Sequence, residues 1–187
     1  FSKVLSVKVH KGFEGTGIRN AVVTTGSFDG VHVGHKVIIK QLVERAKELG
    51  GESVLITFYP HPRKVLYPDS VGKDLLMIST YEEKIIALED LGLDHLIMVN
   101  FTLDFSKTSS VDFIRKYLVA KLAVKHVIIG FNHHFGHNRE GDLEYLLELG
   151  KFYKFSVEEI QEQDIQNESV SSTKIRKALQ EGNIQRA

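Results

Sequence analysis

Two histidines lie three residues apart in the stretch GSFDGVHVGH, residues 26–35, together with three glycines and one aspartate. The stretch follows the apolar run 21–23, so Gly34 and His35 are expected at the N-terminus of a helix, where free backbone N–H groups and the helix dipole favour an anion. It has neither the Lys-Ser/Thr ending of a P-loop nor the spacing of the dinucleotide fingerprint. His32 and His35 are therefore the candidates to donate imidazole N–H groups to phosphate oxygens. In the charged form they would also oppose the negative charge that develops in phosphoryl or nucleotidyl transfer.

A second histidine-rich stretch, GFNHHFGHNREG, occupies residues 130–141. It follows another predicted strand, so it is expected at the same edge of the sheet as the first stretch. Five of its side chains could meet an anionic ligand there: Asn132, His133, His134, His137 and Arg139.

A third stretch, SVSSTKIRKAL at residues 169–179, places three hydroxyl side chains at a predicted helix start, those of Ser171, Ser172 and Thr173. Arg176 follows one turn later on the same helix face. Hydroxyls, free backbone amides and a guanidinium together suit a triphosphate.

The stretch TFYPHP, residues 57–62, closes a predicted strand with His61 between two prolines. Prolines restrict the backbone on both sides of this histidine. The stretch is either a stiff turn or one wall of a ligand site.

The other stretches also have plainer interpretations. His32 and His35 could be turn and helix-start residues with satisfied hydrogen bonds, and the third stretch could be an ordinary N-cap followed by a basic, solvated helix. Residues 130–141 could form a histidine-rich surface loop, or a zinc site in which His133, His134 and His137 join His35. Adjacent histidines rarely both reach one ion, and three anion-suited stretches at strand ends favour a site for an anionic ligand.

Short apolar runs alternate with longer amphipathic ones along the chain, as expected for an α/β protein with a doubly wound parallel sheet of about five strands. The predicted strands are 21–25, 53–58, 96–99, 127–129 and a short one near Val157. The predicted helices are 35–49, about 80–91, about 110–122, 143–152 and 172–182, the second beginning with a capping box of Ser79 or Thr80 with Glu82 or Glu83. Residues 59–78 are expected to be irregular, and loops of that length are often lids or binding loops.

Composition limits the classes of partner. The chain has 187 residues, of which 42% are hydrophobic, enough for one core and one domain. Lys plus Arg equals Asp plus Glu at 24 each, so no long-range field would gather nucleic acid or an anionic membrane. There is no cysteine, which fits a reducing cytosol, and there is no signal peptide or membrane-length apolar run. We therefore expect a cytoplasmic protein without nucleic-acid or membrane partners.

Four stretches, GSFDGVHVGH, TFYPHP, IIGFNHHFG and SSTKIRKAL, occur in this order over about residues 20–187. Together they resemble the FMN adenylyltransferase module of bacterial bifunctional riboflavin kinase/FAD synthetases. The H-x-G-H element alone indicates only the wider nucleotidyltransferase superfamily, whereas FDGVHxGH combined with PHP and SSTxIR is far more specific. The resemblance implies a Rossmann-like fold of the HxGH nucleotidyltransferase type. It also implies formation of FAD and pyrophosphate from ATP and FMN, with Mg²⁺, by direct in-line attack and without a covalent enzyme intermediate.

Carried over by position, the resemblance assigns catalytic roles to His32, His35, Asn132 and Arg176. To ATP binding it assigns Gly26, Ser27, Phe28, Asp29, Gly34, Ser171, Ser172, Thr173 and Arg176, and to FMN binding Phe58, His61, Pro62 and Asn132. It identifies no metal ligand. The family usually has an aromatic residue and an arginine where this chain has His133 and His134, so the role of Asn132 transfers better than any role for these two histidines or for His137.

The resemblance also concerns domain organisation. It implies that residues 1–187 form a single FMN adenylyltransferase domain, without the riboflavin kinase domain to which the full-length protein would be fused. Two other functions stay open from the residues alone. One is a nucleotidyltransferase of the same superfamily with a different phosphorylated acceptor, and the other is a module that binds FMN or ATP without turning it over.

Overall fold

A parallel β-sheet of six strands forms the centre of the protein in the computed structural model, which describes residues 6–130, 136, 141–161, 164–165 and 168–187. The strands lie in the order β1-β4-β3-β2-β5-β6, and each neighbouring pair is parallel. Their bounds are β1 (Lys8–Lys11), β2 (Ala21–Thr25), β3 (Glu52–Tyr59), β4 (His95–Asn100), β5 (His126–Gly130) and β6 (Ser156–Ile160). A short antiparallel pair, β7 (Asp164–Ile165) and β8 (Glu168–Ser169), lies outside this sheet.

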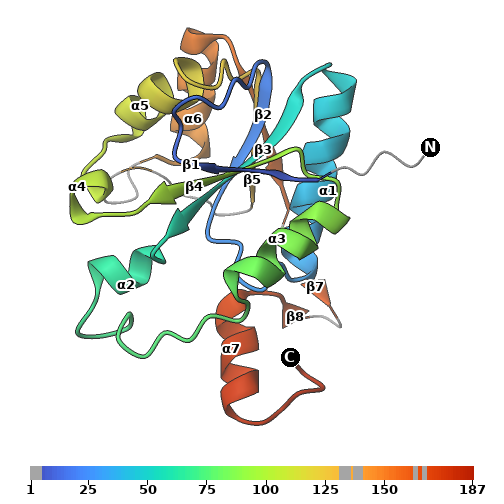
Figure 1. Ribbon diagram of the computed structural model, residues 1–187, viewed down its shortest axis with the longest axis vertical. Coiled ribbons are helices and arrows are strands. Elements are labelled where there is room, and N and C mark those ends of the chain that lie inside the picture. Colours follow the sequence, from blue (N-terminus) through green and yellow to red (C-terminus); the bar gives the residue numbers. More distant parts are fainter. Residues whose placement is uncertain (1–5, 131–135, 137–140, 162–163, 166–167) are drawn as a thin grey trace.

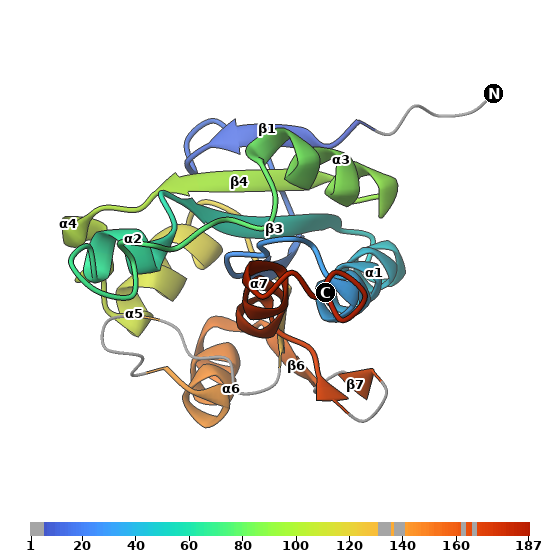
Figure 2. The ribbon, with the colours of Figure 1, turned by 90° about the horizontal axis from the view of Figure 1, so that it is seen from below.

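Helices cover both faces of the sheet (Figures 1 and 2). One face packs against α1 (Val33–Glu48) and α3 (Tyr81–Asp90). The other packs against α5 (Ser110–Phe113), the π-helix that continues it (Ile114–Val119) and α6 (Leu143–Tyr153). Alternate strand residues supply the two cores, as a period of two requires: Val22 belongs to the α1 side, and Ala21 and Val23 belong to the opposite side.

Three further helices lie at the edges of this sandwich. They are α2 (Pro62–Leu66), α4 (Leu103–Ser106) and α7 (Ser172–Gln180). Figure 1 shows α7 below the sheet, and in Figure 2 it lies in front of the strands, beside α1. None of the helices in the described part of the chain has the length and apolar character that crossing a membrane would require.

The order in which the chain adds strands to the sheet determines where the site lies. From β2 the chain moves to β3 and β4 on one side, and it then crosses to β5 and β6 on the other side. The winding direction therefore changes between β2 and β5, which are hydrogen-bonded neighbours. Ligands of such sheets bind beyond the carboxyl ends of the strands at this switch point. The GSFDGVHVGH stretch follows β2 and the GFNHHFGHNREG stretch follows β5, as the sequence predicts.

Several sequence predictions need correction. The sheet has six strands rather than about five, because the edge strand β1 exposes most of its side chains and so has no apolar run. The helix predicted at about 110–122 is a short α-helix followed by a π-helix. Its buried Ile114 and Leu118 keep a spacing of four residues, so hydrophobic periodicity could not separate the two helix types. The segment 59–78, predicted to be irregular, contains α2.

Candidate active site

The turn between β2 and α1 brings the two histidines of GSFDGVHVGH together. His32 is the N-cap of α1, and its Nδ1 accepts a 3.4 Å hydrogen bond from the backbone N–H of His35. The two imidazole rings are stacked, with ring centroids 3.6 Å apart, and Phe28 packs against the ring of His35 at 4.5 Å. Gly34 lies in the first turn of α1. Both rings therefore lie at the positive end of a 16-residue helix, where an anion is stabilised.

Both histidines are held in the neutral form. Burial, together with the nearby His32 and Lys84, lowers the pKa of His35 from its ordinary 6.5 to about 3. Burial also lowers the pKa of His32, although Asp29 opposes the shift. In the described chain, Nδ1 of His35 is a buried polar atom without a hydrogen-bond partner. Folded proteins tolerate such atoms mainly where a ligand or water completes the bonding. Without an anion the pair would therefore donate as neutral imidazoles, not as the charged form that the sequence analysis also considered.

Asp29 joins the turn to the C-terminal helix. Its carboxylate is fully buried and accepts a 2.6 Å charged hydrogen bond from a terminal nitrogen of Arg176. The backbone N–H groups of Ile78 and Ser79 donate to the same carboxylate at 3.0–3.3 Å. Ser172 at the start of α7 donates to the Asp29 carbonyl at 3.0 Å. Although Asp29 was predicted to line the ATP site, its side chain thus faces inward and fastens three segments to one another.

Ser27 is fixed through its carbonyl oxygen. Lys84, on α3, donates to this oxygen at 2.7 Å, and the hydroxyl of Thr57, on β3, donates at 3.2 Å. Gly26, immediately before, donates its N–H to the carbonyl of Ile56 at 3.0 Å. The first predicted stretch is therefore tied to β3, α3 and α7 before any ligand is present.

The TFYPHP stretch ends β3 beside the same turn. His61 caps α2 by accepting a 3.1 Å hydrogen bond from the backbone N–H of Arg63, and Pro62 is the first helical residue. Burial, together with Arg176 and Arg63, lowers the pKa of His61 from its ordinary 6.5 to about 4. Phe58 packs edge-on against Phe101. Arg63, two residues after His61, lines the same cavity as Arg176, so the start of α2 and helix α7 face one another.

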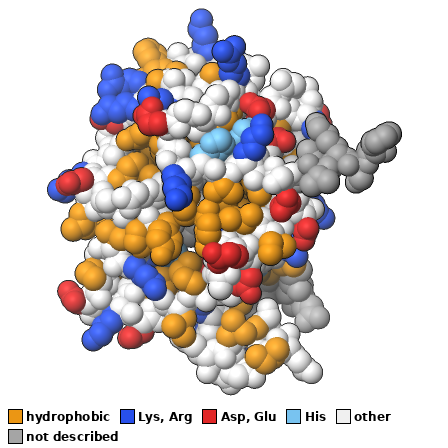
Figure 3. All heavy atoms as spheres, viewed as in Figure 1, with side chains coloured by type: hydrophobic (Ala, Val, Ile, Leu, Met, Phe, Trp, Pro, Cys, Tyr) orange, Lys and Arg blue, Asp and Glu red, His pale blue; other side chains and the backbone are white. Residues whose placement is uncertain are grey.

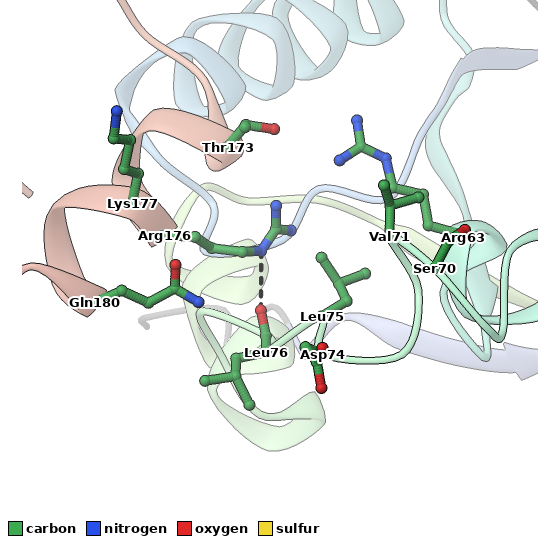
Figure 4. Close-up of a pocket in the computed structure, with 10 residues that line it drawn as sticks. All are labelled: Arg63, Ser70, Val71, Asp74, Leu75, Leu76, Thr173, Arg176, Lys177 and Gln180. Atoms are coloured by element: carbon green, nitrogen blue, oxygen red, sulfur yellow. Dashed lines mark hydrogen bonds between the residues drawn. The ribbon is translucent and has the colours of Figure 1, made fainter.

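A cavity of about 620 Å³ opens between α7 and the segment 63–76 (Figure 4). Figure 4 shows the α7 side chains on one side, the segment on the other and the guanidinium of Arg176 between them, with its Nε donating to the Leu76 carbonyl at 2.9 Å. The lining includes three cations and one carboxylate, Arg63, Arg176, Lys177 and Asp74. An excess of positive charge in a hollow of this size suits an anionic small molecule.

The segment beside this cavity also leaves apolar side chains in solvent. Figure 3 shows hydrophobic side chains gathered over the area of α2 and α4 on this face. The exposed large hydrophobic residues of the wider segment 59–77 are Tyr59, Leu66, Tyr67, Val71, Leu76 and Met77. Their proximity to the cationic cavity gives this side of the protein both polar and apolar contact surfaces.

Similarity to known proteins identifies the family of this chain. The sequence matches the FAD synthetase family over residues 16–174. The chain belongs to the FAD synthetase family. A Listeria monocytogenes protein named bifunctional riboflavin kinase/FMN adenylyltransferase is 36% identical over 90% of this chain. The chain covers 52% of that protein, so it spans about half the length of this relative. Another protein of the same organism, named FAD synthetase, is 32% identical over 90% of this chain and 67% of its own length.

A solved structure confirms the fold class of this FAD synthetase family member. The structure is titled "Crystal Structure of Macrolide-efflux Protein from Streptococcus pneumoniae" and has a TM-score of 0.80 with 24% sequence identity. The match covers 95% of this chain and 58% of that one. At this level of identity the likeness shows the fold alone, which is the predicted Rossmann-like α/β sheet.

The third predicted stretch reaches the site through α7. Ser171 is the N-cap of this helix, and its side chain accepts from the backbone N–H of Lys174 at 3.3 Å. Thr173 is exposed and lines the cavity. The predicted Asn132, His133, His134, His137 and Arg139 lie outside the described residues. Within the part of the chain that is described, no group of three or more histidine or acidic residues is arranged to hold a metal ion.

Lys84 was not among the residues predicted from the sequence. The lysine is 8% exposed and follows the capping box of Thr80 and Glu83 on α3. A charged residue four positions before the fully buried Leu88 lies on the apolar face of the helix, and that spacing was the available signal. Nothing in the sequence indicated that its partner would be a carbonyl in the turn after β2.

Proposed function

We propose that this chain transfers the adenylyl group of ATP to FMN, giving FAD and pyrophosphate. A single arrangement carries the proposal: the stacked His32 and His35 begin α1 at the switch point of the sheet, and α7 meets the same turn through Arg176 and Asp29. Two helix starts with imidazole, hydroxyl and guanidinium donors are thus joined at one turn, and such donors suit a polyphosphate. The family match and the names of the relatives supply the acceptor, which the geometry alone does not identify.

On the ATP side, we place the triphosphate between the starts of α1 and α7. Backbone N–H groups of both helix starts and the hydroxyl of Thr173 would donate to it. Arg176 uses Nε and one terminal nitrogen for the protein, so its guanidinium keeps further N–H donors for a phosphate. Gly26 and Phe28 contribute the shape of the turn, and Phe28 itself is buried against His35.

On the FMN side, we place the flavin phosphate near His61 and Asn132, as the family resemblance implies. His61 is neutral at physiological pH because its pKa is about 4, so it would donate without carrying charge. The partly buried Phe58 and the exposed apolar residues of the segment 59–77 offer contact area for an aromatic ring. This assignment is consistent with the cationic cavity on the same side of the protein.

The reaction needs no protein nucleophile. An oxygen of the FMN phosphate forms a bond to the α-phosphorus of ATP, and the bond from that phosphorus to the bridging oxygen of the β-phosphate breaks. The electron pair leaves with pyrophosphate. The attacking phosphate is already ionised at neutral pH, so neither histidine has to remove a proton. His35 and His32 would act by donating hydrogen bonds to oxygens that gain charge in the transition state.

Magnesium would enter with ATP. The acidic side chain at the turn, Asp29, is bound by Arg176 and by backbone amides, so it is not free to act as a ligand. Mg²⁺ commonly binds through substrate phosphates with few protein carboxylates, and the residues present fit that mode. When bound, the ion neutralises phosphate charge, and the residues of this chain orient the two substrates.

Incubation with ATP, FMN and Mg²⁺ should yield FAD and pyrophosphate in equal amounts, detected by chromatography and a coupled pyrophosphate assay. Riboflavin with ATP should give no FAD, because it lacks the attacking phosphate. Folded protein that forms no FAD would refute the proposal. Tight binding of both ligands without pyrophosphate release would instead favour a binding module, and turnover with another phosphorylated acceptor or another nucleotide would favour a different nucleotidyltransferase.

Acid should destabilise the protein through His35. The folded-state pKa of about 3 lies below the ordinary value of 6.5, so stability is complete above pH 6.5 and falls as the pH drops from 6.5 towards 3. At pH 5 the unfolded chain protonates this histidine and the folded chain does not, which costs about 2 kcal/mol. The free energy of unfolding in urea should therefore fall between pH 7.5 and pH 5. The fall should be about 2 kcal/mol smaller in His35→Gln than in the wild type. An equal drop in both proteins would contradict the burial argument.

A further inference from the structure

The turn after β2 is held in a strained backbone conformation. Phe28 and Val31 have positive φ angles of 46° and 37°, and Gly30 has a φ of 80°. Side chains rarely adopt this region, and it is least favourable for a β-branched residue such as Val31. Strain of this kind persists where the surrounding structure over-determines the backbone. The residues that hold the turn are therefore part of how its histidines are aimed.

Two buried donors meet at the carbonyl of Ser27. Thr57 is 2% exposed and donates from β3, and Lys84 is 8% exposed and donates from α3. The Lys84 hydrogen bond, at 2.7 Å, is the shorter of the two. Asp29 fastens the other side of Phe28 to Arg176 and to the amides of Ile78 and Ser79. Phe28, the first strained residue, thus lies between two fixed points, the Ser27 carbonyl and the Asp29 carboxylate. Lys84 supplies the charged donor to the Ser27 carbonyl.

A lysine at this position has an energetic cost. Burial lowers the pKa of Lys84, which means that desolvation of the ammonium is only partly offset, chiefly by the charge of Asp29. An apolar residue on this face of α3 would avoid that cost. The ammonium also contributes to the electrostatic potential at the histidines, where it helps to lower the pKa values of His35 and His61. Fold stability alone does not account for a buried cation placed against the loop that carries the histidines.

We propose that Lys84 is a positioning residue for nucleotidyl transfer: its ammonium holds the Ser27 carbonyl and thereby fixes the turn of residues 26–30 against the bound triphosphate. This inference rests on the proposed function. Lys84 acts through the turn and through the electrostatic potential at the histidines, and it does not itself contact ATP. Thr57 donates to the same oxygen but carries no charge. Comparing the two residues therefore separates the contribution of the hydrogen bond from that of the charge.

The test compares Lys84→Met with Thr57→Val. Lys84→Met removes a charged donor while keeping the length of the side chain, and kcat/KM for ATP should fall roughly 10- to 100-fold. Thr57→Val removes a neutral donor of similar shape, and the fall should be roughly two- to tenfold. The KM for FMN should change little in either variant. The pKa of His35, followed by NMR, should rise in Lys84→Met and stay constant in Thr57→Val, because only the first variant removes a charge.

Lys40→Met is the matched control, because Lys40 is exposed on α1. It should leave turnover, ATP affinity and the pKa of His35 unchanged, and thermal unfolding should show that all variants are folded. A Lys84→Met protein with wild-type kcat/KM for ATP, or with an equal loss for FMN, would overturn the inference. Calorimetric ATP affinity and the NMR titration do not depend on turnover. If the wild type formed no FAD, these two measurements would still decide the role of Lys84.

Discussion

His35→Ala should lower kcat roughly 100- to 1000-fold, the usual loss when one donor to a developing charge is removed. The affinity for ATP should fall much less, because a contact that strengthens in the transition state contributes little to the ground state. The position of the residue supports this expectation. His35 lies in the first turn of α1 and is stacked on His32, and its pKa of about 3 makes it a neutral donor before substrate binds.

A matched control separates this effect from the loss of a packed ring. His10 is also stacked on another histidine, His95, with ring centroids 5.2 Å apart, but the pair lies on β1 and β4, which β3 separates from β2 in the sheet. His10→Ala should therefore leave kcat unchanged. The measurements are steady-state kinetics with FMN and ATP, and titration calorimetry with ATP. An unchanged kcat in His35→Ala, or equal losses in both variants, would remove His35 from the mechanism.

The arrangement of the sheet could be predicted from sequence because its signals are local. Buried parallel strands give continuous apolar runs, such as 21–23, and the glycine-rich turn marks where the first of them ends. The capping box on α3 was also predicted, and the structure confirms it for Thr80 with Glu83. Once strands and helices alternate, the position of the first histidine stretch at the carboxyl edge follows from topology.

The contacts inside the site could not be predicted in the same way. Asp29 and Arg176 are separated by 147 positions, and Lys84 and Ser27 by 57. No periodicity or motif reports such pairs, because they depend on how the segment after α2 and helix α7 pack against the turn. The sequence predicted that Asp29 and Arg176 both belong to the site, and that Arg176 would face an anion. It did not show that the nearest anion would be the carboxylate of Asp29.

Arg176→Ala should reduce the free energy of unfolding by about 3–5 kcal/mol, because it leaves the fully buried carboxylate of Asp29 without its cation. It should also weaken ATP binding far more than FMN binding, by roughly 1.5 to 3 kcal/mol, the value of a charged hydrogen bond. Arg176→Lys should restore neither property fully, since an ammonium cannot serve Asp29 and the Leu76 carbonyl with the geometry of a guanidinium.

A double variant, Asp29→Asn with Arg176→Ala, separates the effect on stability from the effect on ATP binding. It removes the buried carboxylate charge that Arg176→Ala leaves unpaired, so part of the stability should be recovered. ATP affinity then separates two roles for the arginine. If Arg176 grips the triphosphate directly, affinity for ATP stays low in the double variant although the fold is restored. Recovery of ATP affinity together with stability would show instead that Arg176 serves only to hold α7 against the turn. Urea unfolding, and calorimetry with ATP and FMN separately, distinguish these results, and an equal loss for both ligands in Arg176→Ala would contradict direct contact with ATP.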